Sequence, residues 1–252
     1  MRNPLTVAVV QPVWAGPDVL ANAERHAQAI EESEARLLVF PELSLTGYDL
    51  DAQSLAVDDS RLQPITEACR STGAVAPVGA PVRDPDGREC IATLAVTGED
   101  TTPVYRKMHL HGPESDRFTP GAEPAVLTVD GWRPGLAICY DAAVPQHAAD
   151  TAALGIDAYV ASTIYGPGPA SSARRDSHMR ERAIAHGTWV VLATAAGSSG
   201  TFPQTSGGSG IWTPDGEPAA QADTGAGRTV AFTIRTPARS GTARPLPGGG
   251  PV

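Results

Sequence analysis

Short apolar runs alternate with segments whose apolar residues recur every three or four positions. Leu5–Val10 is rich in β-branched residues and ends at Gln11-Pro12, which is typical of a buried strand. After Pro17-Asp18, apolar side chains recur at helical spacing, namely Val19, Leu20, Ala23, Ala27 and Ile30. Arg36–Phe40 is the next apolar run, and it stops at Pro41-Glu42. The chain is therefore predicted to begin with strand, helix and strand.

The alternation continues to about residue 234. Further helices are predicted at about 60–71, at Pro145–Leu154 and at Ala173–His186. Further strands are predicted at Val75–Val82, Cys90–Val96, Val104–Lys107, Ala125–Val129, Leu136–Cys139, Ala158–Ala161, Trp189–Ala193, Gly210–Trp212 and Arg228–Ile234. The last two strands flank the turn Pro214-Asp215-Gly216. Such alternation is typical of a layered α/β structure with a mixed sheet.

One domain over residues 1–235 is expected, because no linker and no internal repeat interrupts the pattern. Residues 236–252 contain almost no large apolar side chain and include three consecutive glycines. Such a segment buries too little surface to offset the entropy of ordering, so we expect a flexible C-terminal tail. The alternative is an arm that packs on a partner subunit.

Composition narrows the classes of partner. The formal net charge of −9 disfavours binding to nucleic acid or to an anionic membrane. We find no apolar run long enough for a secretion signal or a membrane span, so a cytoplasmic protein is expected. The three cysteines, Cys69, Cys90 and Cys139, form no CxxC pair, so a zinc site made mainly of thiolates is not expected. No other metal-ligand spacing appears in the sequence, and we expect no metal or organic cofactor.

Cys139 and Glu42 both lie where a predicted strand ends. Cys139 follows the apolar run Gly135–Ile138 and precedes a helical segment, whose free amides and dipole would favour a thiolate. The alternative for Cys139 is a small buried apolar residue, which is the interpretation we give Cys69 and Cys90. Burial beside its apolar run would raise the proton affinity of Glu42, as suits a general base. Its alternative is an exposed loop carboxylate.

Lys107 lies between a predicted strand and a loop, in Val104–Leu110. A lone lysine is most often a solvated side chain, so a catalytic role for Lys107 depends on the residues near it. A thiol is only a few per cent ionised near neutral pH, and therefore needs a base or a cation close by. Glu42 and Lys107 would supply one of each to Cys139.

Three segments together resemble the signature segments of the nitrilase superfamily. They are Phe40-Pro41-Glu42-Leu43 with Thr46-Gly47-Tyr48, then Tyr105-Arg106-Lys107-Met108-His109-Leu110, and finally Gly135-Leu136-Ala137-Ile138-Cys139-Tyr140-Asp141. They stand in the order of that family, with about the expected gaps. Glu114–Gly121 is similar to the family segment that carries a second active-site glutamate, and Arg182-Ala183 and Ser209 fit later landmarks. The resemblance runs from about residue 5 to residue 234.

The resemblance implies a four-layer α-β-β-α sandwich with two mixed sheets and hydrolysis of a non-peptide carbon–nitrogen bond through a thioester. By position, Cys139 would be the nucleophile and Glu42 its base, while Lys107 and the backbone N–H of Tyr140 would stabilise the oxyanion. Glu114 would position substrate or assist proton transfer. A small amide is the expected substrate, bound near Tyr48, Tyr140 and Ile164, the last within Ser162–Ala173. A homodimer or larger homo-oligomer is also implied.

Several alternatives stay open. Gln146 and His186 stand where many relatives carry acidic or amide side chains, which weakens the transfer of substrate and of subunit packing. A nitrile or an N-carbamoyl compound is the alternative to an amide substrate. A catalytically idle binding or assembly subunit is a further interpretation. A cysteine–histidine hydrolase would use one of the available histidines, which are His109, His111, His147, His178 and His186.

Overall fold

The computed structural model describes residues 2–236, so the predicted tail, apart from residue 236, lies outside the described residues. The helices are α1 (Val19–Glu31), α2 (Gln63–Thr72), α3 (Tyr140–Ala143), α4 (Pro145–Ala153) and α5 (Pro169–His186), with short 3-10 helices η1 (Ser60–Leu62) and η2 (Gly112–Asp116). The strands are β1 (Leu5–Gln11), β2 (Leu37–Val39), β3 (Ala76–Arg83), β4 (Glu89–Val96), β5 (Thr101–Arg106), β6 (Pro134–Ile138), β7 (Ala158–Thr163), β8 (Trp189–Thr194), β9 (Ala196–Ser199), β10 (Phe202–Ser206), β11 (Gly210–Trp212), β12 (Pro218–Gln221) and β13 (Arg228–Ile234).

These strands build two main sheets, and both are mixed. The first has the order β13-β1-β2 and continues into β3-β4-β5 through a parallel bridge between Leu37 and Val75. Within it, β1 pairs parallel with β2 and antiparallel with β13. The second sheet has the order β12-β11-β8-β7-β6, in which β6, β7 and β8 are parallel and β11 is antiparallel to β8.

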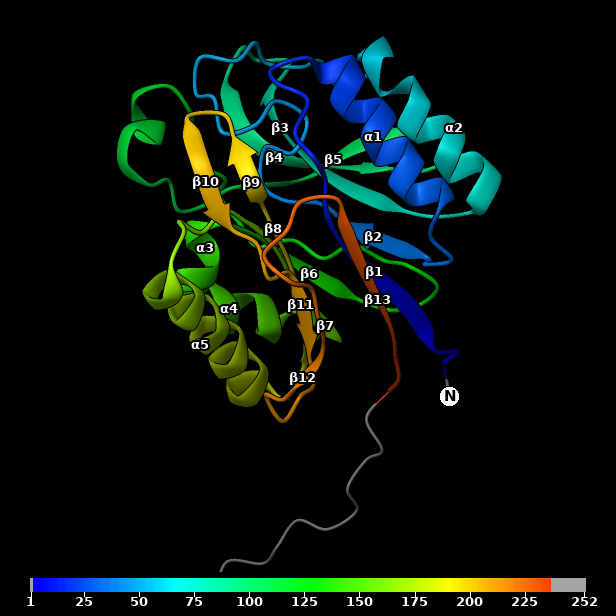
Figure 1. The fold of residues 1–252 in the computed structure, drawn as a ribbon, viewed down its shortest axis with the longest axis vertical. Coiled ribbons are helices and arrows are strands. Elements are labelled where there is room, and N and C mark those ends of the chain that lie inside the picture. Colours follow the sequence, from blue (N-terminus) through cyan, green and yellow to red (C-terminus); the bar gives the residue numbers. More distant parts are fainter. Residues whose placement is uncertain (1, 237–252) are drawn as a thin grey trace, which may run out of the picture.

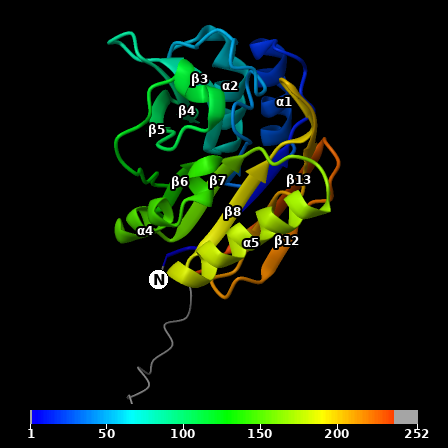
Figure 2. The same cartoon turned by 90° about the vertical axis from the view of Figure 1, so that its left-hand side faces the viewer.

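The two sheets pack face to face between two layers of helices (Figures 1 and 2). The alternating side chains of β1 show why its sequence is apolar throughout. Ala8 and Val10 join the core under α1 and α2, whereas Val7 and Val9 join the core between the sheets. A strand that is buried on both faces has a continuous run of apolar residues in its sequence. The α-β-β-α sandwich predicted from the sequence is confirmed.

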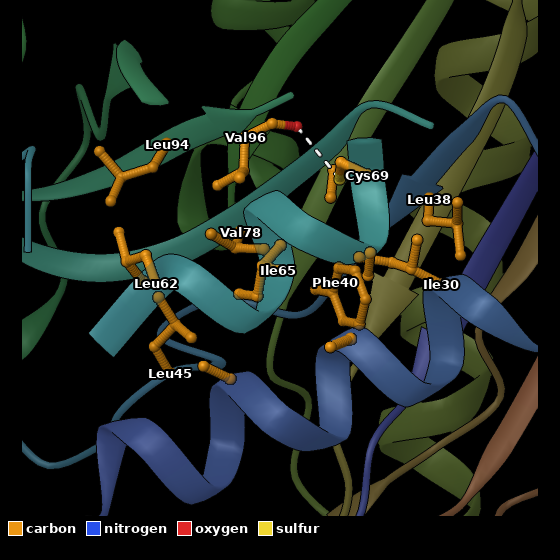
Figure 3. Close-up of a cluster of buried hydrophobic side chains, with 14 of the residues drawn as sticks. Ile30, Leu38, Phe40, Leu45, Leu62, Ile65, Cys69, Val78, Leu94 and Val96 are labelled. Atoms are coloured by element: carbon orange, nitrogen blue, oxygen red, sulfur yellow. Dashed lines mark hydrogen bonds between the residues drawn. The ribbon is translucent and has the colours of Figure 1, made fainter. Parts of the chain in front are cut away.

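Three apolar cores separate the four layers. Figure 3 shows the first core, in which Ile30 of α1 and Ile65 of α2 pack with Leu38 and Val78 of the first sheet and with Phe40, which directly follows β2. The second core lies between the sheets, and the third joins the second sheet to the helices through residues such as Tyr159, Met179 and Val190. No helix within residues 2–236 is long and apolar enough to span a bilayer.

Some predicted elements were wrong. Ala125–Val129 forms no strand and makes isolated bridges at Val126 and Val129. The reason is Pro134 opposite, which accepts a hydrogen bond from Leu127 but has no N–H to return one. Helix α5 begins at Pro169 instead of Ala173, with proline in the first turn.

The β9–β10 hairpin and β12 were not predicted. The turn Pro214-Asp215-Gly216 joins β11 to β12, instead of leading directly to Arg228–Ile234. The sequences of β9, β10 and β12 lack an apolar run because these short strands lie partly exposed at sheet edges or in a separate two-stranded sheet. Periodicity therefore gives little signal there.

Candidate active site

Four reactive side chains meet although they come from distant parts of the chain. Glu42 lies in the turn after β2, Lys107 directly follows β5, Glu114 belongs to η2, and Cys139 directly follows β6. The first two are attached to one sheet and Cys139 to the other. The site therefore lies where the edges of the two sheets come together, and it depends on their packing.

Lys107 is the centre of this cluster. Its Nζ atom lies 2.7 Å from Glu42 Oε1 and 2.7 Å from Glu114 Oε1, and each of the three residues is 1% exposed. A charged ammonium group at such depth requires anionic partners. Burial lowers the pKa of Lys107, but the neighbouring acidic groups, Glu42 above all, outweigh this effect, so the pKa is raised overall. Lys107 therefore stays protonated.

Glu42 offers a free proton acceptor. Its Oε1 accepts from Lys107, whereas its Oε2 is buried and has no hydrogen-bond partner within the described residues. Burial raises the pKa of Glu42; Lys107 opposes this shift and Glu114 adds to it, and the net direction is upward. A carboxyl group with one unpaired oxygen and a raised pKa is suited to take a proton.

The turn that carries Glu42 is held against β3 at Gly79. Leu45 donates its backbone N–H to the Gly79 carbonyl at 3.1 Å, and Gly79 donates to Ser44 Oγ at 3.3 Å. A Cβ atom at residue 79 would lie 2.5 Å from the backbone nitrogen of Leu43. A side chain there would displace the turn, so glycine is required for the position of Glu42.

Cys139 occupies a sharp turn between β6 and α3. Its backbone has φ 48° and ψ −101°, a conformation that is costly for a residue other than glycine. The turn is held because Cys139 donates its N–H to the Ser162 carbonyl at 2.9 Å and its own carbonyl accepts from Ala142 at 3.0 Å. The partly exposed thiol is 3.6 Å from the Ile164 carbonyl, to which it donates.

The predicted effect of the helix N-terminus does not decide the pKa of Cys139. Burial raises the pKa of the thiol, the negative charge of Glu42 raises it further, and Lys107 lowers it by less. Helix α3 has four residues, which is about one turn, so its dipole is weak. The thiol therefore stays protonated until a base takes its proton. Cys69 and Cys90 are buried as predicted, and burial raises the pKa of Cys69 to about 11.

The remaining predicted site residues surround this cluster. Tyr48 donates its hydroxyl to Glu114 Oε1 at 2.7 Å, and the backbone N–H of His111 donates to Glu114 Oε2 at 2.8 Å. Tyr140 is 42% exposed, and its ring lies 4.7 Å from that of His111. Ile164 contributes the carbonyl that faces Cys139. The structure thus brings all seven predicted residues to one place, with the Tyr48 hydroxyl directed at Glu114.

Part of the surroundings of the site could not be predicted. The β9–β10 hairpin is clamped to the backbone of Tyr48, because Thr201 donates its N–H to the Tyr48 carbonyl at 3.0 Å and Ser199 Oγ accepts from Tyr48 at 3.3 Å. The ring of Phe202 packs edge-on against the ring of Tyr48, with 5.1 Å between the two ring centroids. The presence of Gly200 at the hairpin tip is the one sequence signal for this close contact.

The histidines make other contacts. His109 bonds to Asp141, His147 to Tyr105 and Tyr159, and His178 to Tyr165. No hydrogen bond joins a histidine to Cys139 within residues 2–236. The geometry therefore gives no support to a cysteine–histidine pair. The same residues contain no group of three or more His, Cys, Asp or Glu side chains arranged to hold a metal ion.

Comparison with known proteins gives a consistent set of relatives. The family model described as Carbon-nitrogen hydrolase matches residues 6–241. A hydrolase of Mycobacterium tuberculosis is 27% identical over 241 residues, which cover 87% of this chain and 86% of that protein. An (R)-stereoselective amidase of a Pseudomonas species is 31% identical over 65% of this chain and 63% of its own length. A hydrolase of Pseudomonas protegens is 32% identical over 58% of this chain, and the match spans 54% of that relative.

Solved structures show the same fold. Nit3 of Saccharomyces cerevisiae, a member of branch 10 of the nitrilase superfamily, has a TM-score of 0.81 and 21% identity over 91% of this chain and 89% of its own. A variant of the amidase from Nesterenkonia sp. AN1, carrying the acetamide moiety of fluoroacetamide at its active-site cysteine, has a TM-score of 0.81 and 22% identity over 91% of this chain and 90% of its own. A variant of that amidase in complex with butyramide has a TM-score of 0.79 and 23% identity over the same shares.

Proposed function

Since the chain belongs to the carbon–nitrogen hydrolase family of the nitrilase superfamily and is a hydrolase of carbon–nitrogen bonds, we propose that it hydrolyses a small amide with Cys139 as nucleophile. The observation that carries this proposal is the buried Lys107, held 2.7 Å from each of two glutamates beside the cysteine. This arrangement supplies a base, a fixed positive charge and a nucleophile without a cofactor.

Acylation begins when Glu42 Oε2 takes the proton from Cys139 Sγ. The sulfur then attacks the amide carbonyl carbon, and the negative charge moves to the carbonyl oxygen. Lys107 Nζ and the backbone N–H of Tyr140 stabilise that oxyanion, and one such donor is worth roughly 3–4 kcal/mol. The tetrahedral intermediate collapses as the carbon–nitrogen bond breaks. Glu42 returns the proton to the leaving nitrogen, so ammonia or an amine departs and a thioester remains.

Deacylation reuses the same groups. Glu42 takes a proton from a water molecule, which attacks the thioester carbonyl, and Lys107 again faces the oxyanion. The carbon–sulfur bond breaks, Cys139 recovers its proton from Glu42, and the carboxylic acid leaves. Glu114 is oriented by Tyr48 and by the His111 N–H, so its role in this proposal is to hold Lys107 and the substrate amide.

An amide is preferred over the alternatives because both named amidases among the relatives act on or bind that class. One is the (R)-stereoselective amidase, and the other is the Nesterenkonia amidase seen with butyramide. A nitrile or an N-carbamoyl compound remains the alternative substrate. The idle-subunit alternative is disfavoured by the presence of Glu42, Lys107, Glu114 and Cys139 together. The single domain at 1–235, the cytoplasmic location and the homo-oligomer stay predictions.

Ammonia release tests the proposal. The panel contains small aliphatic amides, ω-amides, N-carbamoyl compounds and nitriles, with Cys139→Ala as the inactive control and Cys69→Ala as the matched control at a buried thiol. We expect release from amides by the wild type and by Cys69→Ala, and none by Cys139→Ala. Release from nitriles or N-carbamoyl compounds alone would replace the amide assignment. No release, together with a Cys139 that iodoacetamide does not alkylate, would favour an idle subunit.

A further inference from the structure

Asp141 is a buried carboxylate beside the site to which the proposed reaction gives no role. It is 0% exposed and accepts four hydrogen bonds. Its Oδ1 accepts from the backbone N–H of His109 at 2.8 Å and from His109 Nδ1 at 2.9 Å. Its Oδ2 accepts from the Tyr105 hydroxyl at 2.7 Å and from the backbone N–H of Ile138 at 3.0 Å. A carboxylate with four donors is fully satisfied and fixed in orientation.

The hydrogen-bond donors to Asp141 come from residues close to Lys107 and to Cys139. Tyr105 is two residues before Lys107, and His109 is two residues after it. Ile138 directly precedes Cys139, and Asp141 itself lies two residues beyond that cysteine in α3. One carboxylate therefore binds both flanks of the lysine to the turn of the nucleophile, across the junction of the two sheets.

A polar chain behind Asp141 supports it. Because the Tyr105 hydroxyl donates to Asp141, its oxygen accepts from His147 Nε2 at 2.8 Å. His147 Nδ1 then accepts from the hydroxyl of Tyr159 at 2.9 Å. Burial lowers the pKa of His147, which keeps the ring neutral and fits this single direction of donation. The chain ends on β7, so Tyr105 is held from both sides.

We propose that Asp141 is a positioning residue that fixes Lys107 Nζ relative to Cys139 Sγ, with Tyr105 as its link to β5 and His147 as the support of that link. The inference rests on the proposed function of Lys107 and Cys139. Hydrogen bonds at both flanks leave the backbone of Lys107 little freedom to shift toward or away from the sulfur. A displacement of about 1 Å at a reacting centre costs up to roughly 100-fold in rate.

The test compares Asp141→Asn and Tyr105→Phe with the wild type, and uses Asp86→Asn as the matched control. Asp86 is an exposed carboxylate in the turn between β3 and β4 that accepts from Arg88 at 2.6 Å, outside the site. Two properties are measured. The first is kcat and KM, with the enzyme concentration taken as the concentration of Cys139 that iodoacetamide can alkylate. The second is the pH dependence of Cys139 alkylation by iodoacetamide. Circular dichroism and thermal melting verify that each variant is folded.

For Asp141→Asn we expect kcat to fall roughly 10- to 100-fold with little change in KM, and the alkylation midpoint to move to higher pH as Lys107 leaves the thiol. Tyr105→Phe keeps the charge of Asp141 and should shift both readouts in the same direction by less. Unchanged kcat with a lower melting temperature would overturn the proposal. So would an alkylation midpoint that moves to lower pH, since that is the direct effect of deleting a negative charge. The alkylation profile needs no substrate, so it remains informative if the amide proposal fails.

Discussion

At the residue scale, the site depends on one buried ammonium group between two carboxylates. Lys107 neutralises part of the charge of Glu42 and Glu114, and its removal would leave two buried acidic groups without a cationic partner. Removing one member of a buried ion pair is strongly destabilising, by about 3–5 kcal/mol, unless the remaining groups take up protons. Lys107 therefore has a structural effect as well as the catalytic role that we propose.

We predict that Lys107→Met lowers kcat by about 100- to 1000-fold, because the oxyanion loses its cation. Lys107→Arg should not restore activity, since a guanidinium group is larger than an ammonium group and is planar, so it does not fit the space between the two glutamates. Arg106→Gln is the control, because Arg106 pairs with Asp84 at 2.5 Å, away from the cluster. The measurement is kcat per folded protein well below the melting temperature. A loss of less than about tenfold in Lys107→Met would contradict the oxyanion role.

His26 makes a second prediction, about acid stability. It is fully buried on α1, its ring is stacked on Phe40 at 4.1 Å, and its Nδ1 lies 2.6 Å from the Asn22 carbonyl. Burial lowers its pKa from 6.5 to about 4, although the Asn22 carbonyl opposes the shift. Below pH 6.5, His26 binds a proton in the unfolded chain but stays neutral in the folded chain. The stability due to this group is therefore complete above pH 6.5 and is lost as the pH falls towards about 4.

Over that window we expect His26 to reduce the free energy of unfolding by up to about 3 kcal/mol. Urea unfolding at a series of pH values measures the slope. His26→Leu should flatten the dependence of the free energy of unfolding on pH. An equal slope in wild type and His26→Leu would show that other groups cause the acid sensitivity.

At the element scale, the β9–β10 hairpin fixes one wall of the site through backbone contact. Gly200 has φ +55°, and a Cβ atom there would lie 2.1 Å from the backbone carbon of Tyr48. The same tyrosine orients Glu114 through its hydroxyl. The hairpin therefore acts on the site through Tyr48, at a distance from the reacting thiol.

Gly200→Ala is predicted to lower kcat/KM about tenfold, because it displaces Tyr48 and with it Glu114. Gly197→Ala on the same hairpin is the matched control. Gly197 also has a positive φ, +70°, but its nearest neighbour would be Ala226 Cβ at 3.6 Å. Both variants carry the backbone strain of a positive φ, about 1–2 kcal/mol. Equal kcat/KM of Gly200→Ala and Gly197→Ala would show that the contact between residue 200 and Tyr48 does not affect catalysis.

The sequence predicts those elements that bury apolar side chains on a regular period. β1 and β8 were found because both faces of each strand are covered. The β9–β10 hairpin was missed because its strands are polar and small, and Ala125–Val129 was overpredicted because a pattern does not reveal that Pro134 lies opposite. A local pattern of apolar residues indicates that a segment can form a strand. Whether the segment pairs in a sheet depends also on the residues of the neighbouring strand.

The candidate site was predictable to a similar degree. Glu42, Lys107 and Cys139 each follow a strand within a distinctive segment, so their types and order already suggested one site. The protonation of Cys139 was not predictable, because it depends on burial and on the closeness of Glu42. The contacts of Asp141 were also hidden, since its four donors are spread from residue 105 to residue 138.

At the scale of the whole molecule, the site is divided between the two sheets. Glu42 and Lys107 follow strands of the first sheet, and Cys139 follows a strand of the second. The apolar core between the sheets, which includes Ile138 and Ile211, is what holds these groups together. The geometry of the site and the packing of the sandwich are therefore expected to be lost in one event.

We predict that activity and far-UV circular dichroism disappear at the same urea concentration. Ile211→Val removes one methylene from the core between the sheets and should cost about 0.5–1.5 kcal/mol. It should move both midpoints together, and Ile65→Val in the core under α1 and α2 should do the same if the sandwich unfolds as one unit. Activity that is lost before the dichroism signal, and more so in Ile211→Val than in Ile65→Val, would mean that the sheets separate locally before the chain unfolds. In that case the junction of the sheets, and not the global fold, would limit the stability of the site.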